Sequence, residues 1–238
     1  AGTGVINLNT SINIKNGNGA IGGTSTGAIT LGNAILEDSV TLTVGTGIAN
    51  VINLAAVTGT ASSPSSNLII NTTGAVTVAG AVGTDIGTVT ITNSGGTTFQ
   101  STVDAETAII TDTTGTVTFQ DNLALGTALV TTAQAYNVSI TGTTNNIAGA
   151  TAFLNTGSVT RGNGTGDTST FAGGLVITAP SSVIIQGTVA TTNTTMTLGD
   201  AGTGVILGAN TSLNAGAGDI NLNGTVSGSS PFSLTPIT

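Results

Sequence analysis

The sequence predicts an all-β protein, a parallel β-helix in which successive coils of chain stack on one another. Strand-like runs of three to five residues recur from end to end, as at 40–44 and 88–92, and clusters of Gly, Asn, Ser and Thr separate them at intervals of about 8–12 residues. Only 5% of the residues are charged. Short segments also resemble one another at a spacing of about 20 residues, which suits one coil of two or three strands.

Each expected strand combines aliphatic or β-branched residues, and several alternate apolar with polar positions, which gives one inward and one outward face. In order along the chain, these runs lie at 5–8, 28–31, 40–44, 51–54, 68–70, 76–78, 88–92, 108–110, 116–119, 138–140, 175–177, 183–185, 196–198, 205–207 and 220–222. No run spaces its apolar residues as a helix would, and Gly and β-branched residues disfavour one almost everywhere. We therefore expect essentially no α-helix.

The composition fits a narrow core and a neutral surface. Apolar residues make up 38% of the chain, which excludes a disordered polar segment, and the scarcity of aromatics leaves small aliphatic side chains to fill the interior. Strands of neighbouring coils lie about 4.8 Å apart, so stacked like charges would repel, whereas Thr, Asn and Ser can hydrogen-bond along the stack. At about 20–25 residues per coil, the chain would form about ten coils and a rod about 50 Å long.

Two internal similarities indicate how the chain is organised. The pair Phe99 and Gln100 recurs as Phe119 and Gln120, within longer similar segments. Residues 1–6 recur unchanged as residues 201–206. We interpret 1–238 as one continuous solenoid segment, with a 200-residue superrepeat at 1–200 and the start of the next at 201–238, cut from a longer protein.

Tandem β-sandwich modules of about 100 residues each are the alternative fold, because they are equally rich in Thr and Val. Sandwiches usually bury larger aromatics in a thicker core than this composition allows. The spacings of the two internal similarities also do not match such a module. The β-helix is therefore the preferred prediction.

Charge and residue types exclude several classes of function. With a net charge of −8 and only Lys15 and Arg161 as basic side chains, the sequence offers no basic patch for nucleic acid. It has no apolar stretch long enough for membrane insertion. The chain also has no His and no Cys, so the usual nucleophile and base pairs are missing and no cofactor is expected.

Carboxylates are the remaining candidates for chemistry. Asp104 and Glu106 would share one face of a strand, with Asp112 and Asp121 expected about one coil onward, whereas the adjacent Glu37 and Asp38 would point apart. Such a cluster could bind Ca²⁺ or cleave a polysaccharide.

The preferred interpretation is that these are solvated loop carboxylates. Sugar cleavage would also need basic or aromatic groups, and Arg161 and Tyr136 are all that could serve. We therefore expect no catalytic, cofactor-binding or metal-binding residues and no enzyme activity.

Two further patterns have a functional and a structural interpretation. The segment 162–167, which ends at Asp167, resembles a Ca²⁺-binding glycine-rich nonapeptide, but its glycines are out of register and a turn is preferred. Thr-x-Thr pairs are typical of ice-binding faces, yet the intervals between successive pairs are not multiples of one coil length. These pairs are Thr41/Thr43, Thr88/Thr90, Thr116/Thr118 and Thr195/Thr197.

The texture of runs such as 74–80, 115–119 and 218–224 resembles the passenger regions of large repetitive bacterial surface proteins, namely filamentous-haemagglutinin-like exoproteins, autotransporter passengers and related adhesins. The resemblance implies a right-handed parallel β-helix, located extracellularly or on the cell surface, in a structural or adhesive fibre. Such families share a shape and not a site, so no functional residue is transferred.

The expected partner is the chain itself. Solenoid ends without charged caps expose strand edges, which predicts head-to-tail contact with adjacent repeats or subunits. Surface glycans are a second expected partner. A glycan- or ice-binding face is the alternative function, and a polysaccharide-cleaving enzyme is a remote one.

Overall fold

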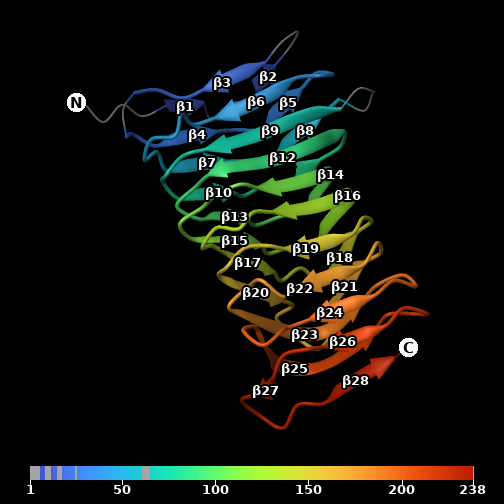
Figure 1. The fold of residues 1–238 in the computed structure, drawn as a ribbon. Helices are drawn as coiled ribbons and strands as arrows, with labels where there is room; N and C mark the ends of the chain where they lie inside the picture. The colour runs from blue at the N-terminus through green and yellow to red at the C-terminus, as the bar shows by residue number, and fades with distance from the viewer. Residues whose placement is uncertain (1–5, 9–11, 15–17, 25, 61–64, 238) are drawn as a thin grey trace.

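The computed structural model describes residues 1–238 except 1–5, 9–11, 15–17, 25, 61–64 and 238. The described chain forms one rod of about ten coils, with its N-terminal coils at one end and its C-terminal coils at the other (Figure 1). Its strands pair in parallel, as the register of every described ladder shows, and the described residues contain no helix, hence none long and apolar enough to cross a membrane. The predicted parallel β-helix is confirmed. The β-sandwich alternative is wrong, because sandwich sheets are antiparallel.

Each coil contributes strands to three faces that run the length of the rod. Face 1 consists of β1 (Ile6–Leu8), β4 (Ile29–Leu31), β7 (Ile52–Leu54), β10 (Val76–Val78), β13 (Thr97–Phe99), β15 (Thr116–Phe119), β17 (Asn137–Ile140), β20 (Ser158–Arg161), the first halves of β23 (Ser182–Ala190) and β25 (Gly204–Asn214), and β27 (Val226–Gly228).

Face 2 follows face 1 in every coil. It consists of β2 (Ile12–Ile14), β5 (Ala34–Leu36), β8 (Val57–Gly59), β11 (Val82–Gly83), the first halves of β14 (Val103–Ile110) and β16 (Leu123–Thr131), β18 (Thr144–Ile147), β21 (Thr168–Phe171), the second halves of β23 and β25, and β28 (Leu234–Ile237).

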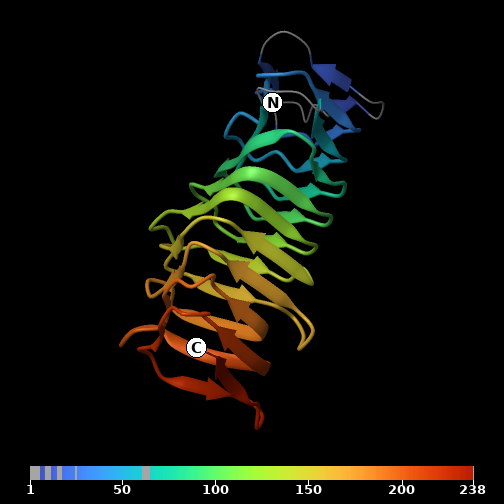
Figure 2. The same ribbon diagram turned by 90° about the vertical axis from the view of Figure 1, so that its right-hand side faces the viewer.

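Face 3 completes the coil and is turned toward the viewer in Figure 1. It consists of β3 (Gly19–Ile21), β6 (Thr41–Val44), β9 (Ser66–Asn71), β12 (Ile86–Asn93), the second halves of β14 and β16, β19 (Thr151–Phe153), β22 (Leu175–Ile177), β24 (Met196–Leu198) and β26 (Ile220–Leu222). Its strands run from right to left while the chain descends from the N-terminal end, so the coil is right-handed (Figure 1). The view from the side shows the coils stacked along the rod axis (Figure 2).

Coil length varies because the turns differ in size. Hydrogen-bonded side chains on neighbouring coils have a sequence separation of 19 between Ser94 and Thr113, and of 26 between Thr41 and Asn67. The local similarity found in the sequence marks one coil, since Phe99 pairs with Phe119 and their rings stack with centroids 5.1 Å apart and planes 3° from parallel. The local repeat predicted from sequence is therefore a true structural unit.

The core is narrow and aliphatic because alternate residues of each strand point inward. In β23 the burial alternates along the whole strand, with Val183, Ile185 and Val189 buried and their neighbours half-buried. Leu, Ile and Val fill most inward positions. Between neighbouring coils, the rings of Phe99 and Phe119 stack, and those of Phe153 and Phe171 meet edge to face. This is the thin core expected from the composition.

Buried hydroxyl and amide groups line the inside of the corner between face 3 and face 1. The Thr72 hydroxyl donates to the Asn50 carbonyl over 2.6 Å, and the Ser94 hydroxyl donates to that of Thr113 over 2.8 Å. All four side chains are at most 2% exposed. Neutral groups thus satisfy one another and the corner backbone from coil to coil, as the lack of charge predicted.

Glycine is required where the chain bends within a strand. Gly187 lies between the two halves of β23 with a φ of 72°, and a Cβ there would lie 2.3 Å from the Asp167 carbonyl oxygen. Only Gly adopts this backbone and leaves room for the neighbouring coil. The bend carries the chain from face 1 to face 2.

Ile6 and Ile206, the last residues of the two copies of the hexapeptide, occupy different ladder positions. Ile6 pairs with Ile29, and the successive pairings from Ile29 along face 1 lead to Val205 and not to Ile206. These two isoleucines are therefore offset by one residue within the stack, and residues 1–5 lie outside the described residues. The superrepeat at 1–200 stays a prediction.

Candidate functional site

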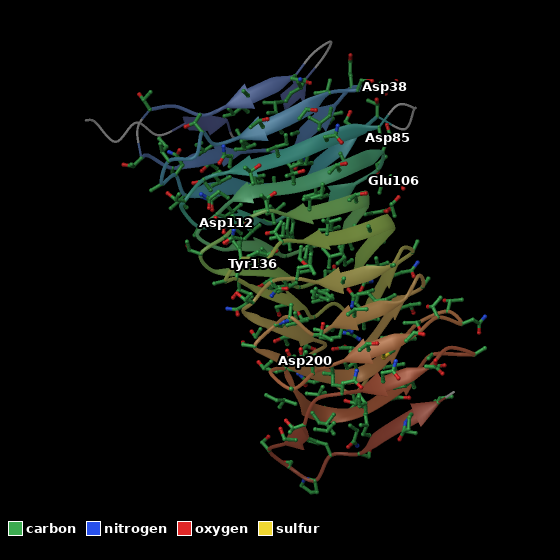
Figure 3. All side chains as sticks on the ribbon, viewed as in Figure 1. Asp38, Asp85, Glu106, Asp112, Tyr136 and Asp200 are labelled. Atoms are coloured by element: carbon green, nitrogen blue, oxygen red, sulfur yellow. The ribbon has the colours of Figure 1, made fainter. Side chains whose placement is uncertain are left out.

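The structure separates the four carboxylates that were considered as a cluster. Asp104 and Glu106 are exposed on β14, near the corner between faces 2 and 3. Asp112 lies at the corner between faces 3 and 1, and Asp121 at the corner between faces 1 and 2. The expectation that Asp112 and Asp121 would lie beside the first two is wrong, because the chain turns a corner between them. Figure 3 shows Glu106 and Asp112 on opposite sides of the rod.

Asp85, and not Asp112 or Asp121, lies near Asp104 and Glu106. It lines a hollow of about 270 Å³ with Asp104, Glu106 and Ser65, one coil before β14. Asp85 has a φ of 60°, and its Oδ2 is buried without a hydrogen-bond partner. The sequence signal for Asp85 was its separation from Asp104, which is close to one coil length.

The carboxylates around the hollow are not grouped closely enough to act together as metal ligands. Among the described residues no group of three or more His, Cys, Asp or Glu is placed to hold a metal ion. The Glu106 carboxylate accepts a hydrogen bond from the Thr127 hydroxyl of the next coil over 3.3 Å. The hollow therefore offers negative charge without a coordination shell.

An acidic edge runs along the corner between faces 2 and 3. It consists of Glu37, Asp38, Asp85 and Glu106, in the N-terminal half of the rod, and Asp219 lies at the same corner several coils further on. Asp38 accepts a 2.8 Å hydrogen bond from the Thr60 hydroxyl, and the side chains of Asp38, Asp85 and Glu106 follow one another down this edge in Figure 3. Lys15 lies outside the described residues.

In the glycine-rich turn at 162–167, the Asp167 carboxylate accepts hydrogen bonds from the backbone of the turn itself. Asp167 is 4% exposed, and its Oδ2 accepts hydrogen bonds from the backbone N–H groups of Asn163, at 2.6 Å, and Gly164, at 3.1 Å. A carboxylate oriented inward and engaged in this way closes the turn. The structural interpretation of this segment fits these contacts.

Arg161 is a buried charge that the sequence reasoning did not place. It is 1% exposed, and its side chain points inward between those of Ile140 and Ile185 on neighbouring coils. Nη2 donates to the Thr188 carbonyl over 3.0 Å, whereas Nε and Nη1 have no acceptor within the protein. Burial lowers the pKa of the guanidinium to about 10, and the nearby Asp167 carboxylate opposes this shift. Its position two residues after inward-pointing Val159 was the available signal.

The Thr-x-Thr pairs do not form a single ladder. Three of them lie on face 3 and the pair Thr116/Thr118 lies on face 1. The outward column that contains Thr43 continues through Ile69, Thr90 and Ile109. Threonine alternates with isoleucine there, so these pairs do not make a regular hydroxyl array.

A regular hydroxyl array exists on face 1 instead. Successive ladder pairings place five outward hydroxyl residues in register, and we call them the hydroxyl ladder: Thr77, Thr98, Thr118, Ser139 and Thr160. In the adjacent outward column, the Ser158 hydroxyl donates to Asn137 Oδ1 over 3.0 Å. Sequence reasoning missed this array because each strand contributes one hydroxyl to it and the coil lengths differ.

Comparisons with known protein families, with curated proteins and with solved structures found no match for this chain.

Proposed function

We propose that this chain is a structural or adhesive rod, a segment of an extracellular or cell-surface fibre whose coils continue through contact with further coils. The observation that supports this proposal is the stack of parallel coils, whose ladders on faces 1 and 2 continue along the described rod around one aliphatic core. Among the described residues, the strands of faces 1 and 2 pair from coil to coil, whereas on face 3 no ladder joins β16 to β19. The outer edges of the end coils have unpaired backbone groups that can extend the stack. The proposal includes no catalytic step.

The C-terminal coil has the side chains that such an extension would bury. Val226 on β27 is 42% exposed and Ile237 on β28 is 48% exposed, whereas equivalent positions one coil earlier, Val205 and Asn214, are buried and half-buried. A further coil, from more of the same chain or from a second copy, would cover these apolar groups. End-to-end contact follows from the same stacking that builds the rod.

Electron microscopy at increasing protein concentration tests this proposal. We expect rods joined end to end, and we expect Val226→Lys to shorten them because the charge would be buried at the junction. Ile35→Lys, a matched change at an exposed apolar residue on face 2, should leave the length distribution unchanged. Wild-type protein that stays as single rods at every concentration would contradict the proposal.

The hydroxyl ladder supports a second candidate function, recognition of a neutral glycan or of ice. Its hydroxyl groups repeat at the spacing of the coils, about 4.8 Å, on a face whose strands carry no charged outward residue. Replacing Thr98 and Thr118 with Tyr would interrupt the array. Retention on neutral polysaccharide, or thermal hysteresis, should be present in the wild type and lost in the double variant. Equal values for both proteins would remove this candidate.

A further inference from the structure

We propose that face 3 joins two copies of the chain side by side through an apolar patch formed by Val130, Ala152, Leu154 and Val176. These residues lie on and beside β16, β19 and β22, in three successive coils. Val130, Leu154 and Val176 are 40%, 47% and 41% exposed. They include three of the seven large apolar side chains that are exposed among the described residues, gathered on one face.

A hollow lies within the apolar patch. It has a volume of about 270 Å³, and its lining includes Ala150, Ala152, Gly173, Gly174 and Val176. Side chains at Gly173 and Gly174 could not fill this hollow. A Cβ on Gly173 would lie 2.3 Å from the Ala150 nitrogen, and Gly174 has a φ of 113°. The hollow is therefore a fixed feature of the backbone.

The patch is self-complementary, which identifies the occupant as a second copy. Leu154 is exposed two residues after Ala152, which lines the hollow, so a protruding side chain and a recess belong to the same face. Under a two-fold axis, Leu154 of each copy would enter the hollow of the other, because such an interface uses one surface patch twice. The exposed apolar groups of both copies would then leave water together.

Charge also favours this face for contact between copies. Each copy has a net charge of −8, so any close approach must keep carboxylates apart. The face 3 parts of β9, β12, β14, β16, β19, β22 and β24 have no charged residue. The acidic edge lies at one border of the face, where solvent can screen it.

The available area is sufficient for a weak dimer. Seven strands spaced about 4.8 Å apart, with outward residues over about 16 Å of each strand, give about 500 Å² per copy and about 1,000 Å² in total. This is near the lower limit for a specific interface between proteins. A dimer that forms with rising concentration is the expected behaviour.

This proposal does not depend on the end-to-end contact, because face 3 and the end coil use different residues. Val226→Lys should therefore leave lateral pairing intact, and changes in the apolar patch should leave end-to-end contact intact. The two proposals can fail separately.

Sedimentation velocity over a wide concentration range tests the lateral dimer, with circular dichroism to confirm that each variant retains its β structure. We expect the wild type to dimerise and added salt to strengthen the dimer, because it screens the repulsion between copies. Val176→Lys and Leu154→Lys should each weaken association by about tenfold or more, since each would bury a charge. Ile35→Lys adds the same charge on face 2 and should not change association.

Three results would overturn the proposal. The wild type could remain monomeric at all concentrations and salt levels. It could dimerise equally well with Val176→Lys, which would place the contact elsewhere. It could stay monomeric while binding a neutral polysaccharide that Val176→Lys no longer binds, which would make a glycan the occupant of the patch.

Discussion

Replacing Arg161 with Met should stabilise the protein. The guanidinium is buried between aliphatic side chains, has one hydrogen bond to the protein, and leaves the N–H groups of Nε and Nη1 without a protein acceptor. The lowering of its pKa to about 10 corresponds to about 3 kcal/mol of unfavourable free energy for the charged form. Met retains the long unbranched side chain, and removing the hydrogen bond to Thr188 costs about 1 kcal/mol.

We therefore expect Arg161→Met to raise the free energy of unfolding by about 2 kcal/mol at neutral pH, measured by urea denaturation. The matched control is Ile185→Met, the next inward residue of the same column, which introduces the same side chain without removing a charge. It should lower stability by about 1 kcal/mol. A destabilised Arg161→Met protein would refute the reasoning. It would show that enclosed solvent or an ion accepts hydrogen bonds from Nε and Nη1 of the guanidinium.

The pH dependence gives an independent check with a defined sign. Folding lowers the pKa of Arg161, so the folded protein releases this proton at a lower pH than the unfolded chain does. The unfavourable contribution is complete below about pH 10 and disappears as the pH rises from there toward the ordinary pKa of the side chain. In that window this residue makes the wild type more stable with increasing pH. The advantage of Arg161→Met should shrink there. A constant advantage would show that charge burial is not its cause.

Three further changes test the packing of the coils, each measured as the free energy of unfolding. Phe119→Ala should cost about 3–5 kcal/mol because it removes a buried ring stacked on Phe99. Tyr136→Phe should cost about 1–3 kcal/mol, since the buried hydroxyl accepts from one backbone N–H and donates to a carbonyl of the preceding coil. Gly187→Ala should cost more than about 1 kcal/mol, because its φ is positive and the added Cβ would meet the Asp167 carbonyl oxygen.

Each of these changes has a matched control and a contradicting result. Thr118→Ala, next to Phe119 but outward-pointing, should change stability by less than about 1 kcal/mol. An equal loss in both variants would mean that the phenyl stack is not what holds those coils together. Wild-type stability in Tyr136→Phe or Gly187→Ala would likewise contradict the contacts described for these residues.

The sequence by itself determined the fold class and the chemistry of the surface. Alternation within short strands, neutral polar residues between them and the one-coil spacing of Phe99 and Phe119 follow from local sequence, because inward and outward positions alternate strictly along a strand. The same rule could have identified Arg161 as inward-pointing from its position after Val159. The lack of His and Cys in the sequence leaves the usual pairs of nucleophile and base without their residues, whatever the fold.

Only the tertiary structure decided which distant residues share a face. The coils differ in the length of their turns, so a fixed period cannot assign residues to columns. For that reason Asp85, and not Asp112 or Asp121, lies with Asp104. For the same reason the hydroxyl ladder contains Thr118 and no other residue of the Thr-x-Thr pairs. Position around the coil is the sum of all preceding turn lengths, and turns on a solvated surface accept insertions at little cost in free energy. The sequence pattern within one strand therefore cannot predict which residues of distant coils lie side by side.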